Sequence, residues 1–260
     1  MYTTLKLATT KDIATITLDR AEKRNAISTA MIEELLAALD AVEKSSARIA
    51  IITGSGNAFC SGMDLELLNA IAQQSPEQNL ADSRRMAGMF RRIWSFPKIL
   101  IAAVNGAAIA GGTGIATMCD FTLAVPEAKF GYTEVKIGFL PAIVSVFLTR
   151  QIGEKQARDL LLTGRIFNAA EAKSLGLVHE VVPADQLATR TQSLAESLLA
   201  ASPTSLTRTK KLLVAAAAAQ VDAELERAIA ENASIRASAD FREGLASFLE
   251  KRKPAWRGEE

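Results

Sequence analysis

Residues 99–141 read ILIAAVNGAAIAGGTGIATMCDFTLAVPEAKFGYTEVKIGFLP, and this stretch decides the fold. Its first six residues, 99–104, are all apolar and predict a buried strand. Asn105-Gly106 is typical of a turn, and the glycines of 111–114 open a second apolar segment. A further strand is predicted at 121–125. This order of strand, glycine turn, helix and strand indicates an α/β fold.

Two features of this stretch suit acid–base chemistry beside a carbonyl group. Glycines at the start of a helix let a ligand approach the backbone, and the free amides there favour negative charge. Glu134 follows about twenty residues later in an apolar neighbourhood, where a carboxyl group can transfer protons. A structural explanation stays open at this point, because such glycines also serve helix–strand packing and Glu134 can lie solvated at a helix end.

Composition bounds the class of protein. The chain has 260 residues, 49% of them hydrophobic, and a net charge of +1, so it can bury a large core and shows no overall bias toward nucleic acid. Cys60 and Cys119 lie among apolar residues, and no segment is typical of a membrane span; we expect reduced thiols and a cytoplasmic location. His179 is the only histidine, which nearly excludes a histidine triad or a multi-histidine metal site.

The first part of the chain alternates strand and helix patterns. Residues 13–18 and 49–53 predict strands, and Ser28 is a candidate cap for a helix that runs to about Val42. The polar segment 73–79 predicts a mobile loop. The helix after it has one apolar face, and we interpret its arginines as a solvated face rather than a phosphate or RNA site: Arg84, Arg85, Arg91 and Arg92.

Beyond Pro141 the pattern changes to helices. We predict helices at 142–151, 154–163 and 168–175, with one strand at 177–182. The chain from 184 to 253 is almost entirely helical in pattern. A helical tail after an α/β body often packs on a partner subunit.

Four segments together carry a resemblance to a known family. They are LDRAEKRNAIS (18–28), AFCSGMDL (58–65), IAAVNGAAIAGGTGIATMCDFTLA (101–124) and FGYTEVKIGFLP (130–141). In this order and spacing the chain resembles the crotonase (enoyl-CoA hydratase/isomerase) superfamily over essentially its full length. Within that superfamily it is most similar to the single-glutamate hydratases of the methylglutaconyl-CoA type.

The resemblance implies a mixed α/β (α+β) fold in two parts. Residues 1–183 would form a spiral of strand–strand–helix turns that holds the thioester site, and residues 184–260 a helical region that builds a homotrimer or a dimer of trimers. The substrate would be an acyl-CoA thioester. Neither a metal nor a redox cofactor is implied, because coenzyme A enters as part of the substrate, and neither nucleic acid nor a membrane is expected as a partner.

By position in the matching segments, the resemblance also assigns site residues. Glu134 would be the catalytic acid–base residue, and the backbone amides of Met63 and Gly111 would form the oxyanion hole. Three residues of the C-terminal helix region are candidates to close the coenzyme site of a neighbouring subunit: Phe241, Phe248 and Lys251. Contacts to coenzyme A and substrate would come from Lys23, Arg24, Ala26, Ser61, Asp64, Leu65 and Gly114.

One departure from the family pattern bears on the reaction. Well-known hydratases of this family carry a second glutamate where this chain has Gly114, so here either a single carboxylate transfers the protons or the second group comes from elsewhere. We therefore expect a hydratase that adds water to the 2,3-double bond of an enoyl-CoA with a branched or carboxylated acyl group. Two alternatives stay open: a Δ3,Δ2-enoyl-CoA isomerase, and a catalytically weak protein of this fold that binds RNA or an assembly.

Overall fold

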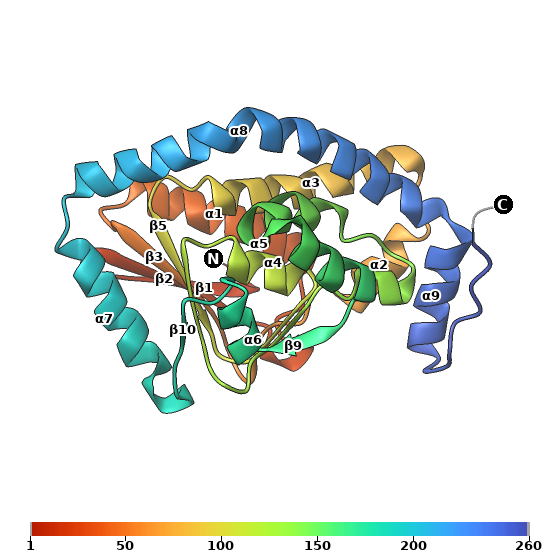
Figure 1. Cartoon of the computed structure of the whole chain (residues 1–260), viewed down its shortest axis with the longest axis horizontal. Coiled ribbons are helices and arrows are strands. Elements are labelled where there is room, and N and C mark those ends of the chain that lie inside the picture. The colour runs from red at the N-terminus through yellow and green to blue at the C-terminus, as the bar shows by residue number, and fades with distance from the viewer. Residues whose placement is uncertain (1, 259–260) are drawn as a thin grey trace.

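The computed structural model describes residues 2–258 and builds them around two β-sheets covered by helices (Figure 1). The larger sheet has the strand order β1-β2-β3-β5-β7-β10, and the smaller sheet has the order β4-β6-β8-β9. The strands are β1 (Leu5–Thr10), β2 (Ile13–Leu18), β3 (Ile49–Gly54), β4 (Ala58–Cys60), β5 (Ile99–Val104), β6 (Ala107–Ile109), β7 (Phe121–Ala124), β8 (Lys129–Gly131), β9 (Ile166–Asn168) and β10 (Glu180–Val181).

Helices lie around the sheets and make up most of the chain after β8. None of those described is long and apolar enough to cross a membrane. The α-helices are α1 (Thr29–Lys44), α2 (Leu65–Ile71), α3 (Pro76–Trp94), α4 (Gly111–Thr117), α5 (Ala142–Thr163), α6 (Ala169–Ser174), α7 (Leu187–Leu199), α8 (Pro203–Ser234) and α9 (Ala239–Leu249). Short 3-10 helices are η1 (Ala21–Lys23), η2 (Glu134–Ile137), η3 (Ala184–Gln186) and η4 (Ile235–Ala237).

The strand pairs β3-β4, β5-β6 and β7-β8 repeat one structural unit. In each unit the first strand adds to the larger sheet, parallel to its predecessor. The second strands, β4, β6 and β8, pair in parallel in the smaller sheet. Helical segments follow each pair: α2 and α3, then α4, then η2 and α5. Successive units therefore wind as a spiral, which confirms the mixed α/β fold and the strand–strand–helix turns expected from the sequence.

Strand β5 lies at the centre of the larger sheet, between β3 and β7. All six of its residues are buried, as expected for a parallel strand covered on both faces. The turn after it brings Gly106 against the backbone of β4, where an added Cβ would lie 2.2 Å from Asn57 O. Glycine is required at this turn because the two backbones touch. The predicted strand, turn and helix at 99–117 are confirmed.

The N-terminal elements follow local capping signals, with one correction. Ser28 caps α1 as predicted, since its hydroxyl accepts a hydrogen bond from Met31 N at 3.2 Å. The loop predicted at 73–79 is limited to 73–75, because Pro76 occupies the first turn of α3 and Ser75 forms a capping box with Gln78. A polar segment with a proline was here the start of a helix.

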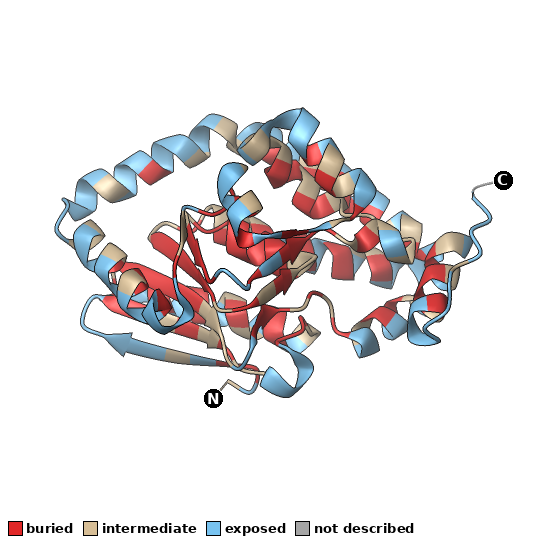
Figure 2. Cartoon of the chain, turned by 60° about the horizontal axis from the view of Figure 1, so that its bottom comes forward, coloured by how far each residue is buried: buried red, intermediate tan, exposed pale blue. Residues whose placement is uncertain are grey.

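The C-terminal helices cover one side of the molecule. Figure 1 shows α8 arching over α3 and α5, and its second half packs on both. The N-terminal part of α8 is bound to the core through Lys210. Its ammonium group lies 2.6 Å from Asp120 Oδ2 and 2.8 Å from Lys98 O. In Figure 2 the strands are largely buried while the outer faces of α7 and α8 are exposed. From Ala184 to Leu249 the chain is almost entirely helical, as predicted for 184–253, and residues 250–258 are not helical.

The four arginines of α3 form ion pairs with carboxylates, which gives them a structural role on the surface. Arg91 Nε lies 2.6 Å from Asp222 Oδ1, and Arg92 contacts carboxylates of α1. Arg84 reaches Glu226 on α8 at 3.7 Å, and Arg85 lies 3.8 Å from Asp82. The Arg85–Asp82 pair lies within α3, and the other pairs join α3 to α1 or α8.

Candidate active site

A cavity of about 770 Å³ lies between α3, the segments that follow β4, β6 and β8, and the ends of α8 and α9. Its mouth is formed by η1 and the start of α2, and its interior by α3, the first residues of α4, η2 and the start of α5. Asn232 of α8 and Phe248 of α9 complete the lining. Most of the interior side chains are apolar, which suits the hydrocarbon part of an acyl chain.

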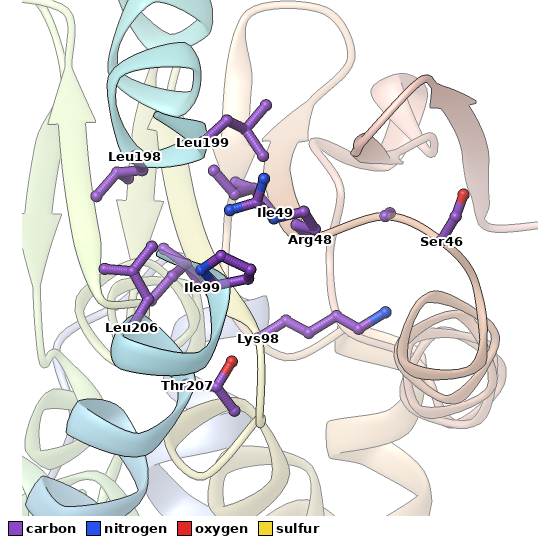
Figure 3. Close-up of a pocket in the computed structure, with 11 residues that line it drawn as sticks. Ser46, Arg48, Ile49, Lys98, Ile99, Leu198, Leu199, Leu206 and Thr207 are labelled. Atoms are coloured by element: carbon purple, nitrogen blue, oxygen red, sulfur yellow. The ribbon is translucent and has the colours of Figure 1, made fainter. Parts of the chain in front are cut away.

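A second, smaller hollow of about 230 Å³ lies at the starts of β3 and β5 (Figure 3). Leu198, Leu206 and their neighbours on α7 and α8 face it, while Lys98 extends along its edge. Lys98 Nζ is held by Val42 O at 2.7 Å, and Arg48 donates to Ala201 O. The basic groups of this hollow therefore hold segments of the same chain together, and we place the chemistry in the larger cavity.

Glu134 enters the cavity because the element before it is fixed against α4. The hydroxyl of Thr113 in α4 donates to Ala108 O at 2.7 Å and accepts from Gly131 N at 3.1 Å. This side chain joins β6, β8 and α4 at one point. Three residues after Gly131 the chain turns into η2, whose first residue is Glu134.

The carboxyl group of Glu134 is buried without a charged partner. Its exposed fraction is 9%, and Oε2 is buried with no hydrogen-bond partner among the described residues. Burial in this apolar setting raises the pKa of Glu134 from 4.5 to about 7, against a smaller lowering by a backbone hydrogen bond. A carboxyl group with this pKa can both take up and give back a proton near neutral pH.

Two backbone amides of the cavity wall, those of Met63 and Gly111, have no hydrogen-bond acceptor among residues 2–258. Met63 forms a parallel bridge with Ile27 in which Ile27 N donates to Gly62 O and Asp64 N donates to Ile27 O. The amide of Met63 points away from that bridge. Gly111 is the first residue of α4, where amides have no partner within the helix. Both residues line the cavity.

The start of α4 is held tightly in place. Ala110 has φ +51°, a conformation that alanine rarely adopts, and its amide donates to Gly131 O at 2.7 Å. A Cβ added to Gly112 would lie 2.1 Å from Cys60 O, so the helix packs directly on the backbone of β4. The amides at this helix start are thereby fixed relative to β4 and β8, as an anion-stabilising site requires.

Comparison with known proteins agrees with this geometry. Residues 8–259 match the family described as enoyl-CoA hydratase/isomerase. The chain belongs to the enoyl-CoA hydratase/isomerase family. A Thermus thermophilus protein with an enoyl-CoA hydratase name is 43% identical over 93% of this chain and 96% of its own length. A crystal structure of an enoyl-CoA hydratase/isomerase from Xanthobacter autotrophicus Py2 has a TM-score of 0.89 at 32% identity, covering 97% of this chain and 98% of the other.

Relatives in this family carry different reaction names. The 2,3-dehydroadipyl-CoA hydratase of Escherichia coli is 32% identical over 94% of this chain and 94% of its own. An enoyl-CoA isomerase/hydratase of Mycosarcoma maydis is 31% identical over 94% of this chain and 92% of its own. Family membership therefore shows an enoyl-CoA hydratase/isomerase scaffold and leaves the individual reaction to the residues of the site.

The structure brings most of the predicted residues of this family member together. Glu134, Met63 and Gly111 line one cavity, and six of the seven predicted coenzyme A and substrate residues lie along its mouth or wall. These six are Lys23, Arg24, Ala26, Ser61, Asp64 and Leu65.

The charged groups at the mouth differ in how far they are engaged. Lys23 pairs with Glu66 at 2.8 Å, whereas Arg24 makes no ion pair within residues 2–258. Asp64 is 2.8 Å from Arg20 and caps α2. Burial acts to raise the pKa of Asp64, but the hydrogen bond from Glu66 N and the Arg20 charge outweigh it and lower the pKa. Asp64 thus remains ionised and holds the mouth together.

Gly114, the seventh predicted residue, lies behind the cavity wall rather than in it. A Cβ there would lie 2.9 Å from both Phe90 Cε1 and Val144 Cγ1, side chains that do line the cavity. A glutamate at this position would collide with both. The space that a second carboxylate would need is occupied by an aromatic ring and a branched aliphatic chain.

Several wall residues were not recognised from the sequence. Phe90 was assigned to the apolar face of a helix, and nothing marked Val144 or Asn232 as site residues. The expectation that Phe248 closes a neighbour's site needs correction, because α9 packs on η2 of its own chain and Phe248 lines this chain's own cavity. A Cβ on Gly138, the residue that follows η2, would lie 2.3 Å from the backbone of α9, which shows how closely the two segments meet.

Proposed function

We propose that this protein is a hydratase that adds water across the 2,3-double bond of an enoyl-CoA thioester. The observation that carries this proposal is the buried, unpaired carboxyl group of Glu134 in the same cavity as the free amides of Met63 and Gly111. Coenzyme A would lie at the mouth, near Lys23 and Arg24, with its acyl chain in the apolar interior. Binding of this handle positions the reacting carbons.

The proposed reaction needs one proton donor and acceptor and one oxyanion site. Glu134 as carboxylate removes a proton from water, and the water oxygen bonds to C3 of the thioester. The electron pair of the double bond moves toward the thioester oxygen, where the amides of Met63 and Gly111 stabilise the charge. Glu134 then returns its proton to C2, on the same face, which restores the carboxylate.

A single carboxyl group is suited to both steps when its pKa lies near the working pH. The pKa of about 7 at Glu134 supports this double role. The filled space around Gly114 supports it as well, because a second carboxylate has no room there. Asp64 is ion-paired with Arg20 and Glu66 with Lys23, whereas Glu134 is the buried carboxylate of the wall that has no charged partner among the described residues.

A Δ3,Δ2-enoyl-CoA isomerase is the second candidate, and the same lone carboxylate favours it. Moving one double bond along the chain needs only one group to carry a proton from C2 to C4. The pairing of the α3 arginines with carboxylates of α1, α3 and α8 speaks against the third expectation, an RNA-binding protein. The Arg–carboxylate contacts leave that helix without a free basic face.

Product masses decide between the two reactions. Wild type and Glu134→Gln are each incubated with three substrates, and the products are analysed by mass spectrometry. The substrates are a 2-enoyl-CoA, a 3-enoyl-CoA and a branched carboxylated 2-enoyl-CoA. A product heavier by one water from a 2-enoyl substrate, absent with Glu134→Gln, is expected. Conversion of the 3-enoyl substrate at constant mass, without any hydration, would make the protein an isomerase and overturn the proposal.

We extend the proposal to the acyl group, the assembly and the location. A branched or carboxylated acyl group follows from the resemblance to single-glutamate hydratases. A homotrimer or dimer of trimers is supported by the exposed leucines of α8, Leu212 and Leu213. The buried free thiols of Cys60 and Cys119 suit a cytoplasmic location.

A further inference from the structure

The cavity contains a buried polar side chain that the proposed reaction does not use. Asn232 lies in the last turns of α8, lines the cavity and has an exposed fraction of 5%. Of the other buried polar residues in the lining, Glu134 has a chemical role and Asp64 is paired with Arg20. A buried amide in an apolar wall is costly unless it finds a partner.

The orientation of this amide is fixed by its neighbours. Arg236 Nη2 lies 2.9 Å from Asn232 Oδ1, and Ser83 Oγ lies 3.0 Å from the same oxygen. A guanidinium group can only donate, so the oxygen of the amide must face Arg236. Asn232 Nδ2 has no hydrogen-bond partner within residues 2–258, and it is the amide atom left to face the cavity.

The group that fixes Asn232 is itself immobile. Arg236 is 1% exposed, and its Nη1 lies 2.8 Å from Asp82 Oδ2 and 3.2 Å from Asn79 Oδ1. Arg236 also donates from Nε to Asn232 O at 3.2 Å. A donor held by such a network is pre-organised, because it does not have to be ordered when a ligand binds.

The donor lies well inside the cavity, away from the reacting carbons. Ser83, Met86 and Phe90 lie along one face of α3, and the last two line the cavity. Phe90 reaches the oxyanion region, since a Cβ on Gly111 would lie 3.5 Å from its ring. Ser83 lies about two helical turns before Phe90 on α3, on the order of 10 Å away, and Asn232 of α8 contacts Ser83 there. This span corresponds to several methylene groups of an acyl chain.

We propose that Asn232 determines specificity by donating a hydrogen bond from Nδ2 to an oxygen on the distal part of the acyl chain. The preferred substrates are enoyl-CoA esters with a carboxylate or an uncharged oxygen several methylene groups beyond the double bond. This inference rests on the proposed function, because it takes acyl-CoA esters to occupy the cavity. A chain that ends in a methyl group leaves the donor unpaired, which is the basis of the discrimination.

The variant Asn232→Asp isolates the donor. Aspartate has nearly the same shape and still accepts hydrogen bonds from Arg236 and Ser83, but it presents an oxygen where Nδ2 was. Asn79→Asp is the matched control. Asn79 also faces Arg236 but does not line the cavity, so this change adds the same charge to the same guanidinium from the other side.

The measurement compares three acyl chains of equal length that end in a methyl group, a ketone or a carboxylate, over a series of lengths. Dissociation constants are measured with the saturated thioesters, which cannot react, and kcat/KM for hydration with the 2-enoyl thioesters. Wild type is expected to prefer an oxygen-bearing chain by about tenfold at one chain length, the value of one hydrogen bond. Asn232→Asp is expected to lose this preference and Asn79→Asp to keep it.

The outcomes separate this inference from the proposed function. A preference in binding that depends on Asn232, with no hydration of any ester, supports the inference and overturns the hydratase proposal. Hydration of all three chains without any preference at any length overturns the inference alone. Equal loss of the preference in Asn79→Asp also overturns it, because the effect would then come from the charge at Arg236.

Discussion

Burial raises the pKa of Glu134 from 4.5 to about 7, and this shift couples its chemistry to the stability of the fold. Between these two pH values the folded state holds a proton that the unfolded chain has released. The free energy of unfolding therefore falls as the pH rises through this window. Above pH 7 the folded protein carries a buried carboxylate without a charged partner.

Replacing Glu134 by glutamine should therefore stabilise the protein at pH 8. The pKa shift corresponds to a gain on the order of 3 kcal/mol, an upper value because the site can relax. Tm is measured by calorimetry at pH 8 and pH 4.5 at equal protein concentration, and the gain should be present only at pH 8. Glu33→Gln, which changes an exposed glutamate of α1, is the control and should show no such difference. A lower Tm for Glu134→Gln at pH 8 would contradict the assigned environment.

Arg24 is expected to contribute charge to coenzyme A binding at the cavity mouth. Its guanidinium makes no ion pair within the described residues, whereas Lys23 beside it is paired with Glu66. Arg24→Ala should raise KM for an enoyl-CoA ester a fewfold at low salt, with less effect at high salt because exposed charges are screened. Lys11→Ala, in the exposed turn between β1 and β2, removes the same charge elsewhere and should leave KM unchanged. If Lys11→Ala raised KM as much as Arg24→Ala, the effect would come from overall charge and not from a contact of Arg24 with coenzyme A.

Single residues of the site differ in how visible they are in the sequence. Glu134 stands alone among apolar residues next to a glycine-rich segment, so local pattern and resemblance both mark it. Asn232 acquires its orientation from Arg236, which is held in turn by Asp82, 154 residues away from it in the chain. No local pattern carries that contact. Val144 is likewise an ordinary apolar residue until the fold places it against Gly114.

At the scale of elements, the packing of α4 on β4 depends on the absence of a side chain at Gly112. A Cβ there would lie 2.1 Å from Cys60 O, and backbone cannot give way cheaply. Gly112→Ala should lower the free energy of unfolding by about 3 kcal/mol and weaken activity, because the oxyanion amide of Gly111 shifts. Gly88→Ala is the matched change on the exposed face of α3, where nothing lies within 4 Å. It should stabilise the protein by about 0.5–1 kcal/mol. Denaturant unfolding measures the free energy of unfolding of both variants. Equal changes in Gly112→Ala and Gly88→Ala would contradict the tight packing of α4 on β4.

Elements with strong local signals were predicted well, and the exceptions have physical reasons. The strand at 99–104 and the helix capped by Ser28 follow from apolar runs and a capping residue. The start of α3 was missed because the capping box at Ser75 resembles a loop in composition. The strand expected at 177–182 is limited to Glu180–Val181, since residues before it contact β7 and α6 through turns.

At the scale of the whole molecule, the first half of α8 exposes two large apolar side chains that nothing in the described chain covers. Leu212 and Leu213 are 72% and 71% exposed on a helix that arches away from the body (Figure 1). Light scattering should give the mass of a trimer or a hexamer. A Leu212→Glu, Leu213→Glu double variant should lower that mass, because it places charge in the proposed interface. Ala223→Glu, on an exposed position of the half of α8 that packs on α3 and α5, should leave it unchanged. A monomeric wild type would contradict the assembly.

The central claim is that Glu134 alone transfers the protons of a hydration reaction, and the pH dependence of kcat/KM for a 2-enoyl-CoA ester tests it most directly. Because the carboxylate form must accept the proton from water, kcat/KM of wild type should rise with pH and level off above an apparent pKa of about 7. Glu134→Gln should lose about a hundredfold or more of this activity and show no such rise. A glutamine variant that hydrates the ester at the wild-type rate, with the same pH profile, would show that another group does the chemistry.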